Sequence, residues 1–226
     1  MAEPDYRARA AAGIAALQRW YEPSSGLWAS TGWWNAANAL TAVIRYTQRT
    51  GDRAYAPVIG TTFARARRRY ADFANSFYDD NGWWALAWLD AYDLTRDGRY
   101  LNAARTIFAR TEAGWDDTCR GGLWWNEDRA YKNAITNELF LTLAARLQQR
   151  APDEDGRYRA WALRAWEWLR SAGLINPGGL VNDGLTPACE NNGGTTPTSL
   201  TPSTTTTGGG HWPGSTPTTS PATAVT

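Results

Sequence analysis

Hydrophobic and charged positions alternate in two different patterns along the chain, and each pattern predicts a different kind of helix. Between Asp5 and Tyr21, apolar residues recur every three or four positions, with Arg and Gln between them. Such spacing predicts an amphipathic helix with one buried face. The segment from Asn35 to Tyr46 carries a single charge, so we expect a helix that is buried on nearly all sides. The residues expected to form the buried face of the first helix are Tyr6, Ala10, Ile14, Leu17 and Tyr21.

The same two patterns then recur. Nearly uncharged segments follow at residues 83–94 and 133–147, and they alternate with amphipathic segments. Each nearly uncharged segment is preceded by a long loop that contains Gly or Trp, and a short polar turn with Gly, Asp and Arg ends it. This is an internal repeat of helical hairpins. The Arg-rich run at residues 65–69 lies inside an amphipathic segment, so we expect a solvated helix face there.

The repeat has geometric consequences for the fold. Helices joined by short turns run antiparallel, so all the long loops gather at one end, where a functional site is expected. Alternation of buried with half-buried helices predicts an inner ring wrapped by an outer one, which is an all-α, α/α toroid. A tetratricopeptide solenoid is the structural alternative, but its period is about 34 residues. The turn residues Tyr55, Tyr100 and Tyr158 lie about 45 and 58 residues apart, which favours the toroid.

Charge and apolar content exclude several classes of protein. The 226-residue chain has a formal net charge of +1, whereas binding to nucleic acid through phosphates requires a concentrated basic surface. The first thirty residues contain no uninterrupted apolar segment of the kind that a signal peptide or a membrane span needs. We therefore expect no nucleic-acid partner, no membrane partner and, by default, a cytoplasmic protein.

Cysteine and histidine are scarce. One His, His211, and two Cys, Cys119 and Cys189, leave no zinc-ligand spacing, and we expect no metal or cofactor. We also expect both cysteines to be free, partly buried thiols. Fourteen Trp and ten Tyr against one Met are an excess of flat rings for a core of Leu, Ile and Val.

Residues 75–88, in the sequence NSFYDDNGWWALAW, carry the strongest candidate chemistry. Asp79 and Asp80 precede a segment with hardly any charge, and we expect them to lie in an active-site loop. Two carboxyl groups can divide proton transfer and nucleophilic attack between them when one lies in a drier place than the other. The alternative is structural: Asp-Asp-Asn-Gly suits a turn, and an Asp before an apolar helix is a favoured N-cap.

Aromatic and polar residues gather at the predicted ends of the long loops. Sugar rings present C–H patches on one face and hydroxyls at the rim, so flat aromatic rings with Asp, Asn and Lys bind them. Core packing is the alternative for each Trp, because buried aromatic residues are common. The candidate sugar-binding residues are Trp33, Trp34, Asn38, Trp83, Trp84, Trp125, Lys132, Asn133 and Asp183.

Four ordered motifs between Asp5 and about Thr196 give the chain a family resemblance. They are GWWNAANAL at residues 32–40, YDDNGWWALAW at 78–88, GGLWW at 121–125 followed by KNAI at 132–135, and NDGL at 182–185. The sequence resembles glycoside hydrolase family 76, the endo-α-1,6-mannanases of bacteria and fungi. The resemblance implies an (α/α)6 toroid and an α-mannan-like polysaccharide or oligosaccharide as the partner.

The resemblance also implies roles for single residues. Asp79 matches the nucleophile of a retaining mechanism, and Asp80 matches its general acid and base. That mechanism needs the carboxyl groups about 5 to 5.5 Å apart, which for neighbours requires a loop that turns both side chains the same way. Asp183 resembles a further sugar-binding acid, and the resemblance suggests cleft contacts for Asn38, Lys132 and Asn133.

The C-terminal part departs from the family pattern. Thr, Pro, Ser and Gly occupy 26 of the 32 positions from Thr195 to Thr226, a composition typical of disorder. We therefore divide the chain into a partial (α/α)6 domain, 1–194, and a disordered tail, 195–226. A glycosylated tail or a linker is one interpretation of this segment; we favour a frame-shifted or truncated end. An incomplete toroid of about seven helices should leave Trp88 and Leu89 partly uncovered and the chain weakly stable.

Three functions remain open at this point. The first is a monomeric hydrolase of α-1,6-mannosidic linkages, with activity lost if the missing hairpins carry cleft residues. The second is a non-catalytic carbohydrate-binding remnant. The third is a helical scaffold for protein partners, whose Trp-rich loops bind no sugar.

Overall fold

The structure is a computed structural model that describes residues 5–152 and 155–191. The chain divides into two units, Met1–Gly194 and Thr195–Thr226. The predicted tail and the predicted frame-shifted end lie outside the described residues and stay predictions.

The described part of the chain contains seven α-helices and only two-residue strands, so the prediction of an all-α fold is confirmed. The helices are α1 (Tyr6–Gln18), α2 (Trp33–Thr50), α3 (Ala56–Ala66), α4 (Tyr78–Thr95), α5 (Gly98–Glu112), α6 (Ala134–Arg150) and α7 (Arg157–Ser171). Two 3-10 turns, η1 (Ala71–Phe73) and η2 (Thr118–Arg120), lie in the longer connections. Strand β1 (Tyr21–Glu22) pairs with β2 (Leu27–Trp28), and β3 (Lys132–Asn133) pairs with β4 (Gly184–Leu185), both antiparallel.

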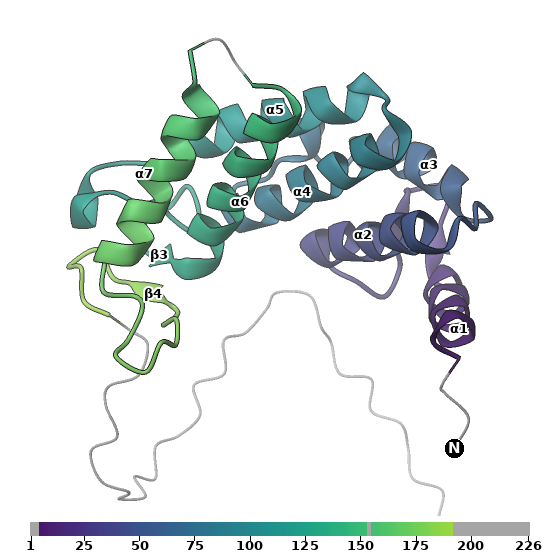
Figure 1. Cartoon of the computed structure of the whole chain (residues 1–226), viewed down its shortest axis with the longest axis horizontal. Helices are drawn as coiled ribbons and strands as arrows, with labels where there is room; N and C mark the ends of the chain where they lie inside the picture. Colours follow the sequence, from purple (N-terminus) through teal and green to yellow (C-terminus); the bar gives the residue numbers. More distant parts are fainter. Residues whose placement is uncertain (1–4, 153–154, 192–226) are drawn as a thin grey trace, which may run out of the picture. The chain divides into compact units, whose positions relative to one another are not determined.

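The helices form two layers, as the charge pattern predicted. Helices α2, α4 and α6 are neighbours in one layer, and each also packs against a helix of the other layer: α1 and α3 against α2, α5 against α4, and α7 against α6 (Figure 1). The layer of α2, α4 and α6 is the predicted inner ring, and the arrangement is that of the (α/α)6 toroid. Because short turns connect the layers, the N-termini of α2, α4 and α6 all lie at the end that carries the long loops.

The short turns end two of the inner helices, α2 and α4, with residues in the left-handed conformation. Gly51 ends α2 at φ 74° and its N–H donates to Thr47 O. Arg96 ends α4 at φ 60° and donates to Tyr92 O. A left-handed residue satisfies a free carbonyl of the last turn and reverses the chain, so the next helix returns antiparallel along the outer layer.

The core is built from stacked aromatic rings between the layers. Trp88 of α4 lies parallel to Tyr100 of α5, with ring centroids 5.6 Å apart, and contacts Phe63 and Phe73 at 5.1 and 4.7 Å. Trp88 and Leu89 are both fully buried, so the expectation that they lack cover is wrong. The cover of Trp88 comes from rings of α3, η1 and α5. Burial of a ring of this size contributes on the order of 4 kcal/mol.

Two details of the helical predictions differ from the structure. Ile14 of α1 is buried, but Tyr6 is 72% exposed and Ala10 is exposed, so the predicted buried face is wrong at both positions. Helix α1 packs mainly on α2, which covers only a narrow stripe of it. The Arg-rich run at 65–69 is exposed at each arginine, as predicted, but α3 ends at Ala66, so residues 67–69 lie in turns and the prediction of a helix face is wrong there.

An ion-pair network around the buried Asp90 joins the inner helices toward their C-terminal ends. Asp90 of α4 is 6% exposed and accepts hydrogen bonds from Arg45 of α2, at 3.2 Å, and from Arg146 of α6. Asp93, one turn further on, pairs with Arg150 of α6. These contacts tie α2, α4 and α6 together at the end opposite the long loops.

Cys119 and Cys189 form a disulfide, with Cα atoms 5.2 Å apart, so the expectation of free thiols is wrong. The pairing of β3 with β4 brings the segment after Leu185 next to η2, which carries Cys119. The two cysteines are 70 residues apart in sequence, and no local pattern shows that contact. None of the helices in the described ranges is both long enough and apolar enough to cross a membrane.

Candidate active site

Asp79 and Asp80 lie in the first turn of α4, not in a loop as predicted. Phe77 is the N-cap residue, so neither aspartate caps the helix and the turn-and-cap alternative is also wrong. The N–H of Tyr78, the first residue of α4, has no partner within the helix. It donates instead to Trp125 O, at 2.8 Å, and this bond stabilises the start of the helix at Tyr78. The positive end of the helix dipole favours negative charge in this turn.

The Asp79 carboxylate accepts two hydrogen bonds. Trp125 Nε1 donates to its Oδ2 at 3.0 Å, and the backbone N–H of Asp80 donates to its Oδ1 at 2.9 Å. Burial raises the pKa of Asp79 above its usual value, and the two hydrogen bonds oppose that rise by stabilising the ionised form. Asp79 therefore accepts one more hydrogen bond from the protein than Asp80 does.

Asp80 has a different environment. Burial raises its pKa to about 6; a hydrogen bond from Asn75 Nδ2 to Oδ2, at 2.7 Å, lowers it, and the charge of Asp79 raises it. Two adjacent carboxyl groups whose environments push their protonation apart are typical of an acid and a nucleophile. Consecutive helix positions point about 100° apart, so the expectation of a loop that turns both side chains the same way is wrong; the two carboxyl groups bond to different partners, one to Trp125 and one to Asn75.

Trp125 is held in place by its own backbone. Its N–H donates to Tyr131 O at 2.7 Å, and its C=O accepts from Tyr78. The ring of Phe77 packs edge-on against it, with centroids 5.1 Å apart. The loop between α5 and α6 is therefore docked onto the start of α4, next to the carboxylates.

Trp34 and Trp83 form an aromatic shelf, the name used below for these two residues. Trp34 lies in the first turn of α2 and Trp83 in the second turn of α4, and their rings stack at 6.3 Å with 27° between the planes. Trp34 is 40% exposed and Trp83 is half-buried. An exposed pair of nearly parallel rings offers the flat surface that a sugar ring needs. Asn38, one turn along α2, donates from Nδ2 to Trp34 O at 3.4 Å and is half-buried.

Two of the predicted sugar contacts are core residues instead. Trp33 is 6% exposed and packs on Tyr70 and Trp84, at 4.9 and 4.5 Å. Trp84 has no exposed surface and lies against Phe73 and Trp88. Rings with so little surface offer no stacking face to a ligand in this structure, so we assign both to the core.

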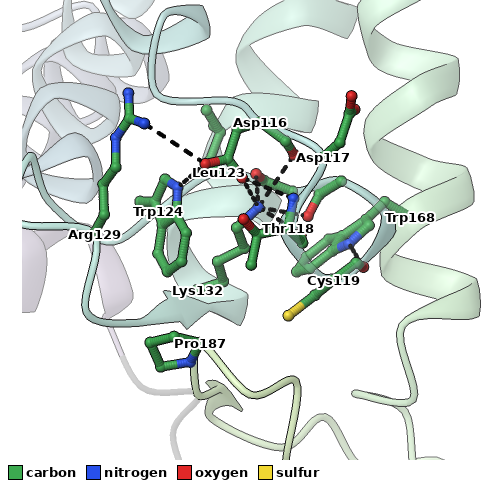
Figure 2. Close-up of polar contacts among 12 residues, drawn as sticks. Asp116, Asp117, Thr118, Cys119, Leu123, Trp124, Arg129, Lys132, Trp168 and Pro187 are labelled. Carbon is green, nitrogen blue, oxygen red and sulfur yellow. Dashed lines mark hydrogen bonds and ion pairs between the residues drawn. The ribbon is translucent and has the colours of Figure 1, made fainter.

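Lys132 has no exposed surface either. Its Nζ donates to Asp116 Oδ1 at 2.6 Å and to four backbone oxygens of the same loop, at 2.8 to 3.2 Å (Figure 2). Burial lowers the pKa of Lys132, while the contact with Asp116 raises it. Burial likewise acts to raise the pKa of Asp116, but hydrogen bonds from Lys132 and Trp124 lower it to about 2. We therefore assign Lys132 to the loop's structure rather than to direct sugar contact.

The residues that Lys132 secures include two glycines for which no other residue type fits. Gly121 and Gly122 have φ of 123° and 89°, and a Cβ on Gly122 would lie 2.4 Å from Trp168. The carbonyls of both glycines point to the ammonium group. Because the backbone at these two glycines lies so close to α7, the loop that carries Trp125 is held in one position.

Asn133 and Asp183 meet where β3 pairs with β4. Asn133 is 5% exposed and is the N-cap of α6, accepting from Thr136 N at 3.3 Å. Asp183 is exposed, and its Oδ2 accepts from the Tyr131 hydroxyl at 2.5 Å. Tyr131 thus connects Asp183 with Trp125 through its hydroxyl and its carbonyl.

Three residues of the site were missed by sequence reasoning: Asn75, Asp116 and Tyr131. Asn75 precedes the Asp pair by four and five positions, but its bond to Asp80 depends on a turn that the sequence does not reveal. Asp116 and Tyr131 lie in a long loop without periodicity, so no pattern distinguished them from solvated residues.

Two further features of the structure bear on what could bind. A cavity of about 270 Å³ lies on the outer layer between α3, η1 and α5; Phe63, Arg67 and Arg99 line it, and none of the predicted site residues does. Within the described residues no group of three or more His, Cys, Asp or Glu side chains is placed to hold a metal ion.

Comparisons with known proteins agree on one family. The model of glycosyl hydrolase family 76 matches residues 6–210. Mannan endo-1,6-alpha-mannosidase DCW1 of Candida albicans is 29% identical over 181 residues, which are 70% of this chain and 40% of that protein. The chain thus spans about two fifths of the length of this curated relative.

Solved structures of an alpha-1,6-mannanase from Salegentibacter sp. HEL1_6 are similar in fold. The enzyme superposes with a TM-score of 0.74 at 29% identity, covering 84% of this chain and 57% of that one. An inactive variant of it, with two consecutive aspartates replaced by alanine and alpha-1,6-mannotetrose bound, gives a TM-score of 0.75 at 27% identity with the same coverage.

Proposed function

Because the chain belongs to glycosyl hydrolase family 76, we propose that it hydrolyses α-1,6-mannosidic linkages of a mannan-like polysaccharide by a retaining mechanism that uses two carboxyl groups. One observation carries this proposal: Asp79 and Asp80 share a helical turn, yet one accepts two hydrogen bonds and the other has a pKa raised to about 6. The family assignment supplies the reaction class, and this asymmetry supplies the roles.

In the first step Asp79 attacks the anomeric carbon while neutral Asp80 transfers its proton to the bridging oxygen. The glycosidic bond breaks, the leaving sugar departs as an alcohol, and an ester joins the mannosyl unit to Asp79. In the second step Asp80, now ionised, takes a proton from water as the water oxygen attacks the anomeric carbon. The ester bond breaks, and both carboxyl groups return to their starting state.

The surroundings of the pair support binding of a sugar chain. The aromatic shelf of Trp34 and Trp83 provides stacking surface at the N-termini of α2 and α4, and Asp183 provides an exposed acceptor for hydroxyl groups. Trp125 is half-buried with its N–H committed to Asp79, so it orients the nucleophile and borders the same space. Asn38 lies beside the shelf as a further polar contact.

The choice of mannan rests on the relatives. DCW1 is a mannan endo-1,6-alpha-mannosidase, and the Salegentibacter enzyme is an alpha-1,6-mannanase whose variant lacking two consecutive aspartates is inactive and binds alpha-1,6-mannotetrose. Asp79 and Asp80 are consecutive aspartates in a similar fold. We therefore propose the same class of substrate, α-1,6-mannan, for this chain.

A hydrolysis assay tests the proposal. Release of reducing ends from linear α-1,6-mannan should fall at least about 10³-fold in Asp79→Asn and in Asp80→Asn, since each removes one half of the mechanism. Asp117→Asn, whose side chain is 96% exposed, makes the same chemical change away from the pair and should keep wild-type activity. Turnover that survives both active-site substitutions would refute the assignment.

A non-catalytic carbohydrate-binding protein is the second candidate, and the exposed shelf is the observation that favours it. Calorimetry with α-1,6-manno-oligosaccharide would then show binding that Trp34→Ala weakens, with no reducing ends released from mannan. A helical scaffold for protein partners predicts no sugar binding in the same experiment.

A further inference from the structure

Asn75 uses each of its polar groups in a defined hydrogen bond. Its backbone N–H donates to Asn81 Oδ1 at 2.8 Å, and its backbone C=O accepts from Asn81 Nδ2 at 3.0 Å. Its side-chain Oδ1 accepts from the backbone N–H of Phe77 at 2.8 Å, and its Nδ2 donates to Asp80 Oδ2 at 2.7 Å. The orientation of the amide is therefore determined, because a flipped amide would place Nδ2 against the N–H of Phe77.

Asn81 makes this arrangement rigid. It is fully buried within α4, and its side chain clasps the backbone of Asn75 from both sides. Asn75 precedes the helix and Asn81 lies near its start, so the pair fastens the incoming chain to the helix that carries Asp80. Rotation of the Asn75 side-chain amide away from Asp80 would also break the bond that its Oδ1 accepts from the N–H of Phe77.

The consequence concerns the two oxygens of Asp80. The N–H of Asn75 points at Oδ2, and the carbonyl oxygen of a neutral carboxyl group is a better acceptor than its hydroxyl oxygen, so this bond favours the tautomer with the proton on Oδ1. Oδ1 is then the atom that donates the proton to the leaving group. When that proton has gone, the hydrogen bond from Asn75 stabilises the carboxylate that remains, which is the base for the second step.

We propose that Asn75 is the positioning residue of the general acid: it binds Oδ2 of Asp80 and thereby directs the transferable proton of Oδ1 toward the leaving oxygen. This inference rests on the proposed function, because it assigns a task within that mechanism. The competing explanation is that Asn75 serves only to shape the turn before α4 through its bond to Phe77.

The variant Asn75→Asp separates the two explanations. An aspartate at this position keeps the oxygen that accepts from Phe77, so the turn is preserved, but it replaces the donor to Asp80 with an oxygen and a negative charge. Asn75→Ala removes both bonds. Asn102→Asp, at an exposed position of α5, is the matched control for an added charge.

The first measurement needs no turnover. Carbon NMR of protein labelled at the aspartate carboxyl groups follows the titration of Asp80, and its pKa should rise by about one unit or more in Asn75→Asp and Asn75→Ala, but not in Asn102→Asp. An unchanged Asp80 titration in both Asn75 variants, with the helix intact, would overturn the inference.

The second measurement compares leaving groups. Hydrolysis of α-1,6-mannan needs a proton on the leaving oxygen and should slow about tenfold or more in Asn75→Asp. A dinitrophenyl glycoside of α-1,6-mannobiose leaves without protonation, so its bond-breaking step should change by less than about threefold. Equal slowing of both substrates would refute the inference in favour of the turn. If the wild type hydrolyses neither substrate, the proposed function fails, and the titration still decides whether Asn75 controls Asp80.

Discussion

Replacing Asp80 with asparagine should make the protein more stable above pH 6 while abolishing activity. The folded state raises the pKa of this carboxyl group from 3.8 to about 6, so the folded protein holds the proton more tightly than the unfolded chain. Below about pH 4 the carboxyl group is protonated in both the folded and the unfolded protein, and its contribution to the free energy of unfolding has its full value. As the pH rises from 4 to 6 the unfolded chain ionises first, and this stability is lost.

The magnitude follows from the shift. For a fully buried group, a pKa shift of about two units corresponds to roughly 3 kcal/mol in the free energy of unfolding. Partial solvent exposure of the Asp80 carboxyl group reduces this to about 1 to 2 kcal/mol. The side-chain amide of the Asp80→Asn variant would remain uncharged at every pH and would keep an oxygen to accept from Asn75, so the variant avoids the loss. In a domain of this size the gain is worth roughly 3 to 6 °C in Tm.

Thermal unfolding at pH 4, 6 and 8 provides the assay. The difference in Tm between Asp80→Asn and wild type should be near zero at pH 4 and should reach its full value at pH 8. Asp117→Asn, at an exposed position, should show no such trend. Destabilisation of Asp80→Asn at all three values, or a gain only at pH 4, would refute the reasoning.

Three further predictions follow from the contacts around the site. Lys132→Met leaves the Asp116 carboxylate and four carbonyls without their donor and should lower the free energy of unfolding in urea by about 3 to 5 kcal/mol. Trp34→Ala should weaken binding of α-1,6-mannotetraose in calorimetry about tenfold with stability within about 0.5 kcal/mol, whereas Trp84→Ala should lose about 3 to 5 kcal/mol of stability. Reduction of the Cys119–Cys189 disulfide opens a 70-residue separation and should lower the free energy of unfolding by about 4 kcal/mol, measured in urea with and without reductant.

The layering of the helices could be predicted because it follows from burial. A helix in the inner layer contacts neighbours on both sides and behind it, so α2 carries only two charged residues among 18, whereas the outer helix α5 carries four among 15 and shows one apolar face. The spacing of charged and apolar residues along the sequence therefore predicts which layer a helix occupies. The clustering of long loops then follows from antiparallel connectivity alone.

The phase of each helix was harder to predict. Trp33 and Trp34 are identical letters, as are Trp83 and Trp84, yet one of each pair is buried and the other lies on the surface. The direction depends on where the helix begins, and α4 begins at Tyr78 because of a bond to Trp125 in a distant loop. The residues that neighbour Tyr78 in the sequence do not indicate that bond.

Long-range contacts account for the other errors. Lysine is rarely buried completely, and Lys132 is buried only because the loop from Asp116 to Gly122 folds its carbonyls around the ammonium group. Cys119 and Cys189 meet because β3 pairs with β4. Each of these contacts depends on the tertiary fold rather than on a pattern of neighbours.

A covalent intermediate on Asp79 is the most direct test of the central claim. Wild-type protein is incubated with an activated fluorinated α-mannosyl inhibitor, digested, and analysed by mass spectrometry. The account predicts one mannosyl adduct on the peptide that contains Asp79, which is absent in Asp79→Asn and present in the control Asp117→Asn. An adduct on another residue, or products of α-1,6-mannan that first appear as the β-anomer, would contradict it.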